Sequence, residues 1–184
     1  VFTELVGINK RYCVNLCHKN RKILRTDKSR FVHIKNNKNY MEINFVSDTI
    51  TKPSREMLVH MLNAVVGDDV YKQDPTVIEL EAKVADMFGM EAGLFFPSGT
   101  MANQTAIKLH TQPGEQLIAD KYAHVYHYEG GGVSFNSGVS CCLLDGNCGM
   151  ITAEQVAGAI NDPEFYHSPL TSLVCVENTT NKGG

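Results

Sequence analysis

The feature that most constrains this chain is the alternation of short apolar runs with helix-like patterns from residue 41 onward. Alternation of this kind predicts an α/β fold, in which helices flank a mainly parallel sheet. Apolar spacing and turn residues set the expected elements. Strands are expected over residues 92–96, 115–119, 139–144 and 172–176, and helices over residues 53–62, 75–88, 100–110 and 124–128, with a further helix after residue 152.

Helix boundaries can be read from single residues. Asp74 followed by Pro75 is a helix start, because Asp caps the free backbone N–H groups and Pro suits the first turn. Gly89 is expected to end that helix. Thr152 and Gln155 have the spacing of a capping box, which predicts a further helix start.

The distribution of charge divides the chain at about residue 40. Residues 1–40 hold ten of the 17 Lys and Arg residues but only two of the 20 Asp and Glu residues. We therefore predict a basic, disordered extension over residues 1–40 and an ordered α/β region over residues 41–184. The extension could be a transit peptide, a nucleic-acid-binding arm or a leader sequence foreign to the domain.

Composition narrows the class of protein. The chain has 184 residues, is 43% hydrophobic and carries a net charge of −3, which suits one globular domain. No apolar run reaches the roughly 18 residues of a membrane span, so we expect no membrane partner. The aromatic side chains between residues 122 and 128 could stack on nucleic-acid bases, but Lys121 is their one basic neighbour. We therefore expect no nucleic-acid partner. The cytoplasm is the expected location, or the mitochondrion if residues 1–40 are a transit peptide.

The cysteines and histidines do not indicate a metal site. Cys13 and Cys17 have a spacing that metal sites use, but no second pair of ligands follows at a suitable distance. Cys175 lies in an apolar run and is expected in the core. We predict reduced, free thiols and no bound metal.

The segment from Phe95 to Asn103 carries the clearest chemical signal. An apolar run enters the turn Pro97-Ser98-Gly99, and a helix is expected to begin at once. The first turn of a helix offers unpaired N–H groups and the positive end of its dipole, so it can bind phosphate. Gly99 would let an anion approach, and Ser98 and Thr100 would add hydroxyl groups. Simple helix capping is the alternative explanation.

Two histidines and one carboxylate are further candidates. His124 follows the next expected strand and would lie at the carboxyl edge of the sheet, where ligands bind in such folds. Its imidazole could stack on an aromatic cofactor or exchange protons, although a surface or capping role is the commoner one for a single histidine. Glu177 ends the last expected strand at the same edge, and His167 precedes that strand.

Several segments together resemble the threonine aldolases, in the order and at the spacing of that family. The resemblance runs from about residue 42 to the end and covers none of residues 1–40. It implies an incomplete large domain of a fold-type-I enzyme that depends on pyridoxal 5′-phosphate (PLP), usually a homotetramer. The segments are residues 47–53, 66–71, 74–76 and 97–104, His124 with Tyr128-Glu129, and residues 176–181.

The resemblance also assigns roles to individual residues. It implies that the PLP phosphate binds at the 98–101 turn, that a histidine stacks on the PLP ring, and that a second histidine lies near the substrate hydroxyl. Two further residues match substrate-binding segments. The implied cofactor-binding residues are Ser98, Gly99, Thr100, Met101 and His124; the catalytic ones are His124 and His167; the substrate-binding ones are Ser47 and Tyr71.

The implied reaction is the cleavage of L-threonine or L-allo-threonine to glycine and acetaldehyde, a step of threonine catabolism and glycine formation. Another PLP lyase on the same fold is an alternative. The chain departs from the family at Asn44-Phe45-Val46 and at Lys182, where the family has arginine. No lysine matches the family lysine that bonds to PLP, so the chain alone is expected to be inactive. An inactive fragment that at most binds phosphate or PLP is therefore the other reading.

Overall fold

The computed structural model describes residues 2–7, 31–36, 39–44 and 48–182. The chain forms two compact units. The first contains residues 1–17 and 96–184, and the second contains residues 18–95. The candidate phosphate turn and both candidate histidines belong to the first unit, which we describe first.

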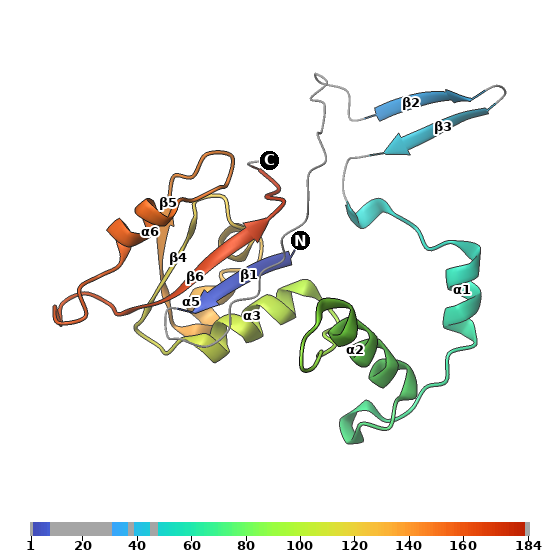
Figure 1. Cartoon of the computed structure of the whole chain (residues 1–184), viewed down its shortest axis with the longest axis horizontal. Coiled ribbons are helices and arrows are strands. Elements are labelled where there is room, and N and C mark those ends of the chain that lie inside the picture. The colour runs from blue at the N-terminus through green and yellow to red at the C-terminus, as the bar shows by residue number, and fades with distance from the viewer. Residues whose placement is uncertain (1, 8–30, 37–38, 45–47, 183–184) are drawn as a thin grey trace. The chain divides into compact units, whose positions relative to one another are not determined.

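A four-stranded sheet forms the centre of the first unit (Figure 1). Its strand order is β1-β6-β4-β5. The central strand β4 pairs in parallel with β5 on one side and with β6 on the other, whereas β1 is antiparallel to β6. The strands are β1 (Phe2–Gly7), β4 (Gln116–Asp120), β5 (Ser140–Leu144) and β6 (Thr171–Asn178).

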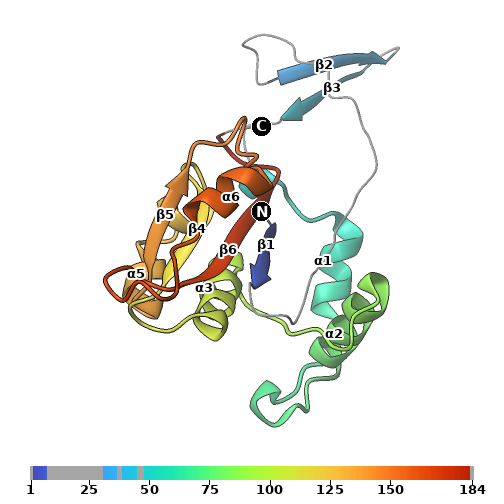
Figure 2. The same ribbon diagram turned by 60° about the vertical axis from the view of Figure 1, so that its left-hand side comes forward.

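Four helices accompany this sheet. Helix α3 packs on β1, β6 and α5, and α6 lies beside β5 (Figure 2). The mainly parallel sheet with flanking helices that the alternating pattern predicts is therefore confirmed. The helices are α3 (Gly99–His110), α4 (His124–His127), α5 (Gly132–Ser137) and α6 (Ala153–Ala159).

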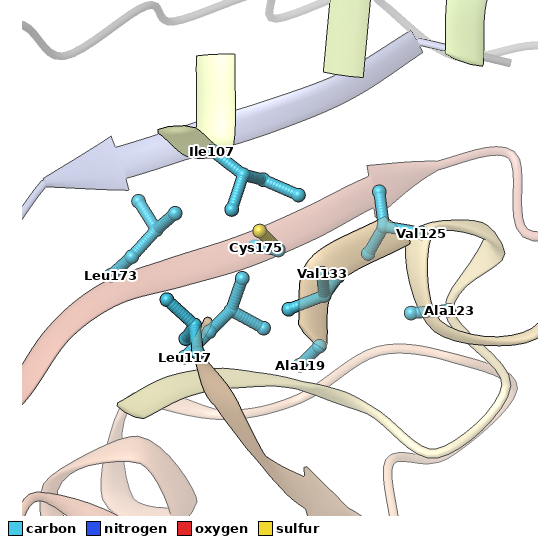
Figure 3. Close-up of a cluster of buried hydrophobic side chains, with 9 residues drawn as sticks. Ile107, Leu117, Ala119, Ala123, Val125, Val133, Leu173 and Cys175 are labelled. Atoms are coloured by element: carbon cyan, nitrogen blue, oxygen red, sulfur yellow. The ribbon is translucent and has the colours of Figure 1, made fainter. Parts of the chain in front are cut away.

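The core of the first unit lies between α3, α4 and α5 and one face of the sheet (Figure 3). Ile107 of α3 meets Leu117 of β4 and Leu173 of β6, and all three side chains are fully buried. Cys175 belongs to the same cluster, as the sequence predicted. Burial raises the pKa of its thiol far above the ordinary value, with smaller contributions from Cys141 and Glu129, so Cys175 is a packing residue.

The described part of the second unit contains a hairpin, two α-helices and two short 3₁₀ helices. Strands β2 (Phe31–Asn36) and β3 (Asn39–Asn44) pair in antiparallel fashion. The short helix η1 (Asp48–Ile50) precedes α1 (Arg55–Leu62), and η2 (Asp69–Tyr71) precedes α2 (Pro75–Phe88). Across the described ranges of both units, every helix is too short or too polar to traverse a lipid bilayer.

Local signals placed most helix boundaries correctly. Asp74 caps α2, Pro75 is its first residue and Gly89 ends it in a left-handed conformation. Thr152 and Gln155 form the expected capping box. Helix α1 starts at Arg55, two residues later than expected, because the Ser54 side chain accepts the Met57 N–H and caps the helix there.

Residues 92–96 do not form the strand that their apolar character predicted. The Phe95 N–H donates instead to the Glu81 carboxylate at 2.8 Å, so a side chain takes the place of a strand partner. At Gly93, a Cβ atom would lie 2.7 Å from the Glu81 carbonyl oxygen, which shows how closely this backbone approaches α2. Apolar runs of this length cannot be assigned to a strand by composition alone.

The structure describes three parts of the basic segment for which a disordered extension is expected. Residues 2–7 and 31–36 are strands, and β3 crosses the expected domain boundary at residue 40. Strand β1 supplies hydrogen-bond partners along β6, which would otherwise be an open edge. Charge patterning did not reveal these strands, because strand formation depends on a partner elsewhere in the chain. Residues 8–30 lie outside the described residues.

Acid should weaken the start of α2 through Asp74. Its carboxylate accepts the N–H groups of Gly67 and Val77, each at 2.9 Å, and these bonds hold its pKa below the ordinary value. Because the folded pKa is lowered, this stabilisation is complete above the ordinary Asp pKa of about 3.9 and is lost as pH falls through the folded pKa. Far-UV circular dichroism should show this acid transition.

Asp74→Asn should remove that acid transition, because asparagine has no proton to gain in this range. Asp86→Asn is the matched control, since Asp86 is an exposed residue of the same helix. The control should keep the transition of the unmodified chain. An unchanged transition in Asp74→Asn would contradict the role given to this cap.

Candidate active site

The carboxyl ends of the parallel strands are tied together by buried polar contacts. Asp120, the last residue of β4, accepts the Tyr122 N–H at 2.8 Å and the Gly146 N–H at 3.0 Å. A Cβ at residue 146 would lie 2.7 Å from the Asp120 carboxylate, so glycine allows this approach. The contacts join the turn after β4 to the loop after β5 and so fix the start of α4.

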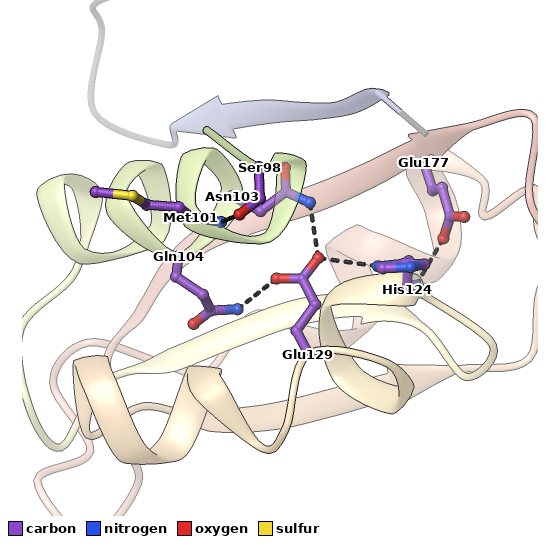
Figure 4. A network of polar contacts seen from close by, with 7 residues as sticks. All are labelled: Ser98, Met101, Asn103, Gln104, His124, Glu129 and Glu177. Atoms are coloured by element: carbon purple, nitrogen blue, oxygen red, sulfur yellow. Dashed lines mark hydrogen bonds and ion pairs between the residues drawn. The ribbon is translucent and has the colours of Figure 1, made fainter. Parts of the chain in front are cut away.

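His124 is held from two sides at this edge (Figure 4). Its backbone N–H donates to the Glu177 carboxylate at 2.7 Å, and its ring Nδ1 lies 2.9 Å from the Glu129 carboxylate. The side chain remains 23% exposed. Its ring centroid is 5.4 Å from that of Tyr128, with the planes tilted by 44°. His124 is therefore fixed in place and still accessible to a ligand.

Glu129 lies at the centre of a buried hydrogen-bond network, and its side chain is fully buried. The Asn103 amide donates to Oε1 at 2.7 Å, and the Gln104 amide donates to Oε2 at 2.6 Å. Together with the His124 ring, these groups satisfy a carboxylate that would be costly to bury alone. Since Asn103 and Gln104 belong to α3, the network joins that helix to His124.

The N-terminus of α3 has the features of an anion site. The Ser98 hydroxyl oxygen accepts the Met101 N–H at 3.1 Å, which leaves the hydroxyl proton available to a ligand. The N–H groups of Gly99 and Thr100 stand in the first turn, where no preceding helical carbonyl can pair with them. Among the described residues outside this turn, nothing lies within 4 Å of the position of a Cβ at Gly99, so the approach is open on their side. The residues present fit a phosphate group.

An open hollow of about 480 Å³ lies along α3 and begins at this turn. Ser98 and Thr100 line one end, and Lys108 lies further along the helix. The volume falls in the range of small-molecule pockets. His124 is not among the lining residues. The hollow therefore reaches the candidate phosphate turn but not the candidate ring-stacking residue.

Within the first unit, His167 is not brought to this edge. His167 lies in the turn before β6, close to the Tyr166 ring at 4.0 Å, and so stands at the amino end of a strand whose carboxyl end carries Glu177. Tyr71 is an exposed residue of η2 in the second unit. Ser47 lies outside the described residues. Met101 is exposed, but its N–H is already bonded to Ser98.

Sequence reasoning named Glu129, Asn103 and Gln104 only as parts of matching segments and gave them no role. Gln104 and Glu129 are 25 residues apart in the sequence, so local patterns could not predict their contact. The sequence did offer one indication that Asn103 lies near the candidate phosphate turn. Asn103 follows Gly99 by about one helical turn, at the same end of α3.

Comparisons with known proteins identify the family of this chain. A family model described as beta-eliminating lyase matches residues 44–184. An uncharacterized Caenorhabditis elegans protein is 43% identical over 154 residues, which cover 82% of this chain and 36% of the relative. The low specificity L-threonine aldolase of Escherichia coli K12 is 41% identical over 140 residues, or 76% of this chain and 42% of the relative.

A plant relative gives the same result. The low-specificity L-threonine aldolase 1 of Arabidopsis thaliana is 42% identical over 144 residues, which cover 75% of this chain and 40% of the relative. The chain thus spans about two fifths of the length of the curated relatives it matches. The family match extends over the parallel sheet and the network around Glu129. The chain belongs to the beta-eliminating lyase family, with the fold-type-I architecture expected, and its resemblance to threonine aldolases is confirmed.

Proposed function

We propose that the protein to which this chain belongs is a PLP-dependent aldehyde-lyase that cleaves L-threonine or L-allo-threonine to glycine and acetaldehyde. The observation that carries the proposal is the network in Figure 4, which joins the fixed but accessible His124 to the helix whose open N-terminus fits a phosphate. The names of the Escherichia coli and Arabidopsis relatives support the choice of substrate class.

The residues present suit PLP at both ends of the cofactor. Ser98, Gly99 and Thr100 would hold the phosphate through free N–H and hydroxyl donors. The accessible ring of His124 would lie against the pyridine ring. When bound, PLP supplies an electron sink for the carbanion that remains on the glycine fragment.

The structure gives His124 a defined geometry for proton exchange. Its Nδ1 is engaged by Glu129, so exchange with a ligand or water would use Nε2. His167, Ser47 and Tyr71 stay in the proposal as catalytic or substrate-binding residues on the strength of the resemblance alone. A homotetramer with sites between subunits and a cytoplasmic location, or a mitochondrial one, are proposed on the same ground.

The chain matches about two fifths of the length of each relative, so the complete reading frame provides a first test of the proposal. Sequencing the transcript past the Gly184 codon should reveal an open frame that encodes the Asp, Arg and Lys of the family. An immediate stop codon would refute the proposal.

Thr100→Ala should lower the affinity for PLP by about 10–100-fold. The change removes a hydroxyl donor to a charged phosphate, a bond worth about 1.5–3 kcal/mol, and each 1.4 kcal/mol is tenfold in affinity. Equilibrium titration of cofactor absorbance would measure the effect. Thr100→Ser, which keeps the hydroxyl, should retain most of the affinity.

Thr105→Ala is the matched control for Thr100→Ala, because it makes the same change further along α3. It should leave PLP affinity unchanged. Equal affinities in the unmodified protein and Thr100→Ala would count against phosphate binding at this turn.

A further inference from the structure

The Glu129 carboxylate has three donors around it. Oε1 is shared by the Asn103 amide and the His124 ring, at 2.7 and 2.9 Å, and Oε2 accepts the Gln104 amide at 2.6 Å. The side chain is fully buried, so water cannot replace a missing donor there. Which atom carries each proton therefore follows from the chemistry of the groups themselves.

Hydrogen bonds at both the oxygen and the nitrogen fix the orientation of the Gln104 amide. Its carbonyl oxygen accepts the Asn136 amide at 3.4 Å, so its NH₂ group faces Glu129. The Gln104 side chain has little room to move, because a Cβ at Gly132 would lie 2.5 Å from its amide carbon. Oε2 of Glu129 is thus an acceptor, and the short contact suits a charged partner.

The same reasoning applies to Oε1. The Asn103 amide donates to this oxygen, so Oε1 accepts a hydrogen bond as well. As an ionised carboxylate, Glu129 can only accept hydrogen bonds, so the bond to His124 requires a proton on Nδ1. The neutral imidazole carries one proton only, which leaves the lone pair on Nε2.

We propose that Glu129 is a positioning residue that fixes His124 as the Nδ1–H tautomer and presents Nε2 as the nitrogen that meets a ligand. The inference rests on the proposed function for its catalytic meaning. It concerns a contact inside this chain, however, and holds whether or not PLP is bound. If Nε2 gains a proton, the adjacent Glu129 carboxylate balances the charge of the imidazolium ring.

The other groups near His124 cannot set the tautomer in this way. Glu177 bonds to the backbone N–H of His124 and not to its ring. His127 contacts the Lys121 carbonyl oxygen through Nε2, at 2.6 Å. Tyr128 approaches His124 as a tilted ring. Glu129 is accordingly the group whose chemistry decides where the ring proton lies.

Nuclear magnetic resonance of the chain with ¹⁵N-labelled histidine tests the inference directly. With the ring neutral, the His124 signals should show a protonated Nδ1 and an unprotonated Nε2. A His124 that is protonated on Nε2, or that populates both tautomers equally, would overturn the proposal. This measurement needs no substitution, so it stands even if a variant fails to fold.

Glu129→Leu provides the second readout. A leucine side chain has no acceptor for the Nδ1 proton, so the Nε2–H tautomer should become populated. Glu79→Leu makes the same change at an exposed position of α2 and should leave the His124 spectrum unaltered. A folded Glu129→Leu chain that keeps a pure Nδ1–H tautomer would refute the positioning role.

The outcome is separable from that of the proposed function. A chain that binds no PLP but shows the Nδ1–H tautomer and loses it in Glu129→Leu would support the positioning role and count against the cofactor. A chain that binds PLP with His124 in the Nε2–H tautomer would support the cofactor and overturn the positioning role.

Discussion

Ile107→Ala is expected to lower the free energy of unfolding by about 2–5 kcal/mol, the range for truncating a large aliphatic side chain in a packed core. Ile107 has no exposed surface and contributes α3 to the cluster that covers β4 and β6 (Figure 3). The cost has two sources, the lost transfer free energy of the methyl and methylene groups and the cavity that they leave. Urea unfolding followed by circular dichroism would measure it.

Leu109→Ala is the control for this prediction, because Leu109 lies two residues further along α3 and is 76% exposed. Its replacement should change stability by less than about 0.5 kcal/mol, as is usual at surface positions. A comparable loss in both variants would mean that α3 does not pack on the sheet as described.

His124→Ala is expected to slow the proposed cleavage reaction by about 10²–10⁴-fold, the usual contribution of a positioned acid or base. The substitution removes the accessible Nε2 and the ring face proposed to meet the cofactor, and it leaves Glu129 with one donor fewer. PLP affinity should fall as well. Acetaldehyde release from L-threonine and L-allo-threonine by the complete enzyme, at saturating PLP, would measure the rate.

His127→Ala is the matched control for His124→Ala. His127 is exposed, lies three residues away in the same short helix and bonds to the Lys121 carbonyl oxygen. Its loss should leave the rate within a fewfold of the original. Similar losses in the two variants would show that α4 matters only as structure, and an unaffected His124→Ala enzyme would exclude His124 from catalysis.

Features fixed by neighbouring residues could be predicted from the sequence. Ser98, Asp74 and Thr152 each cap the helix that follows, since a side-chain oxygen placed there satisfies a free N–H whatever the rest of the chain does. The strands β4, β5 and β6 and the position of His124 after β4 follow from the same kind of local reading, within a residue or two.

Features that depend on distant partners could not be predicted. Glu129 is a central residue of the site because the Asn103 and Gln104 side chains of α3 donate hydrogen bonds to it. Residues 92–96 do not form the predicted strand, because the Phe95 N–H donates to the Glu81 side chain instead of to a neighbouring strand. The position of His167 relative to His124 depends on the direction of the strands, because His167 precedes β6 whereas His124 follows β4.

The turn at residues 98–100 is proposed to bind the phosphate of a pyridine cofactor beside His124. Titrating the ¹⁵N-labelled chain with pyridoxine 5′-phosphate, whose alcohol cannot form an imine, tests this binding. The Gly99 and Thr100 amide signals and the His124 ring signals should shift together, and pyridoxine without phosphate should have no such effect. Unchanged signals at all three residues, or equal shifts with both compounds, would refute the proposed binding.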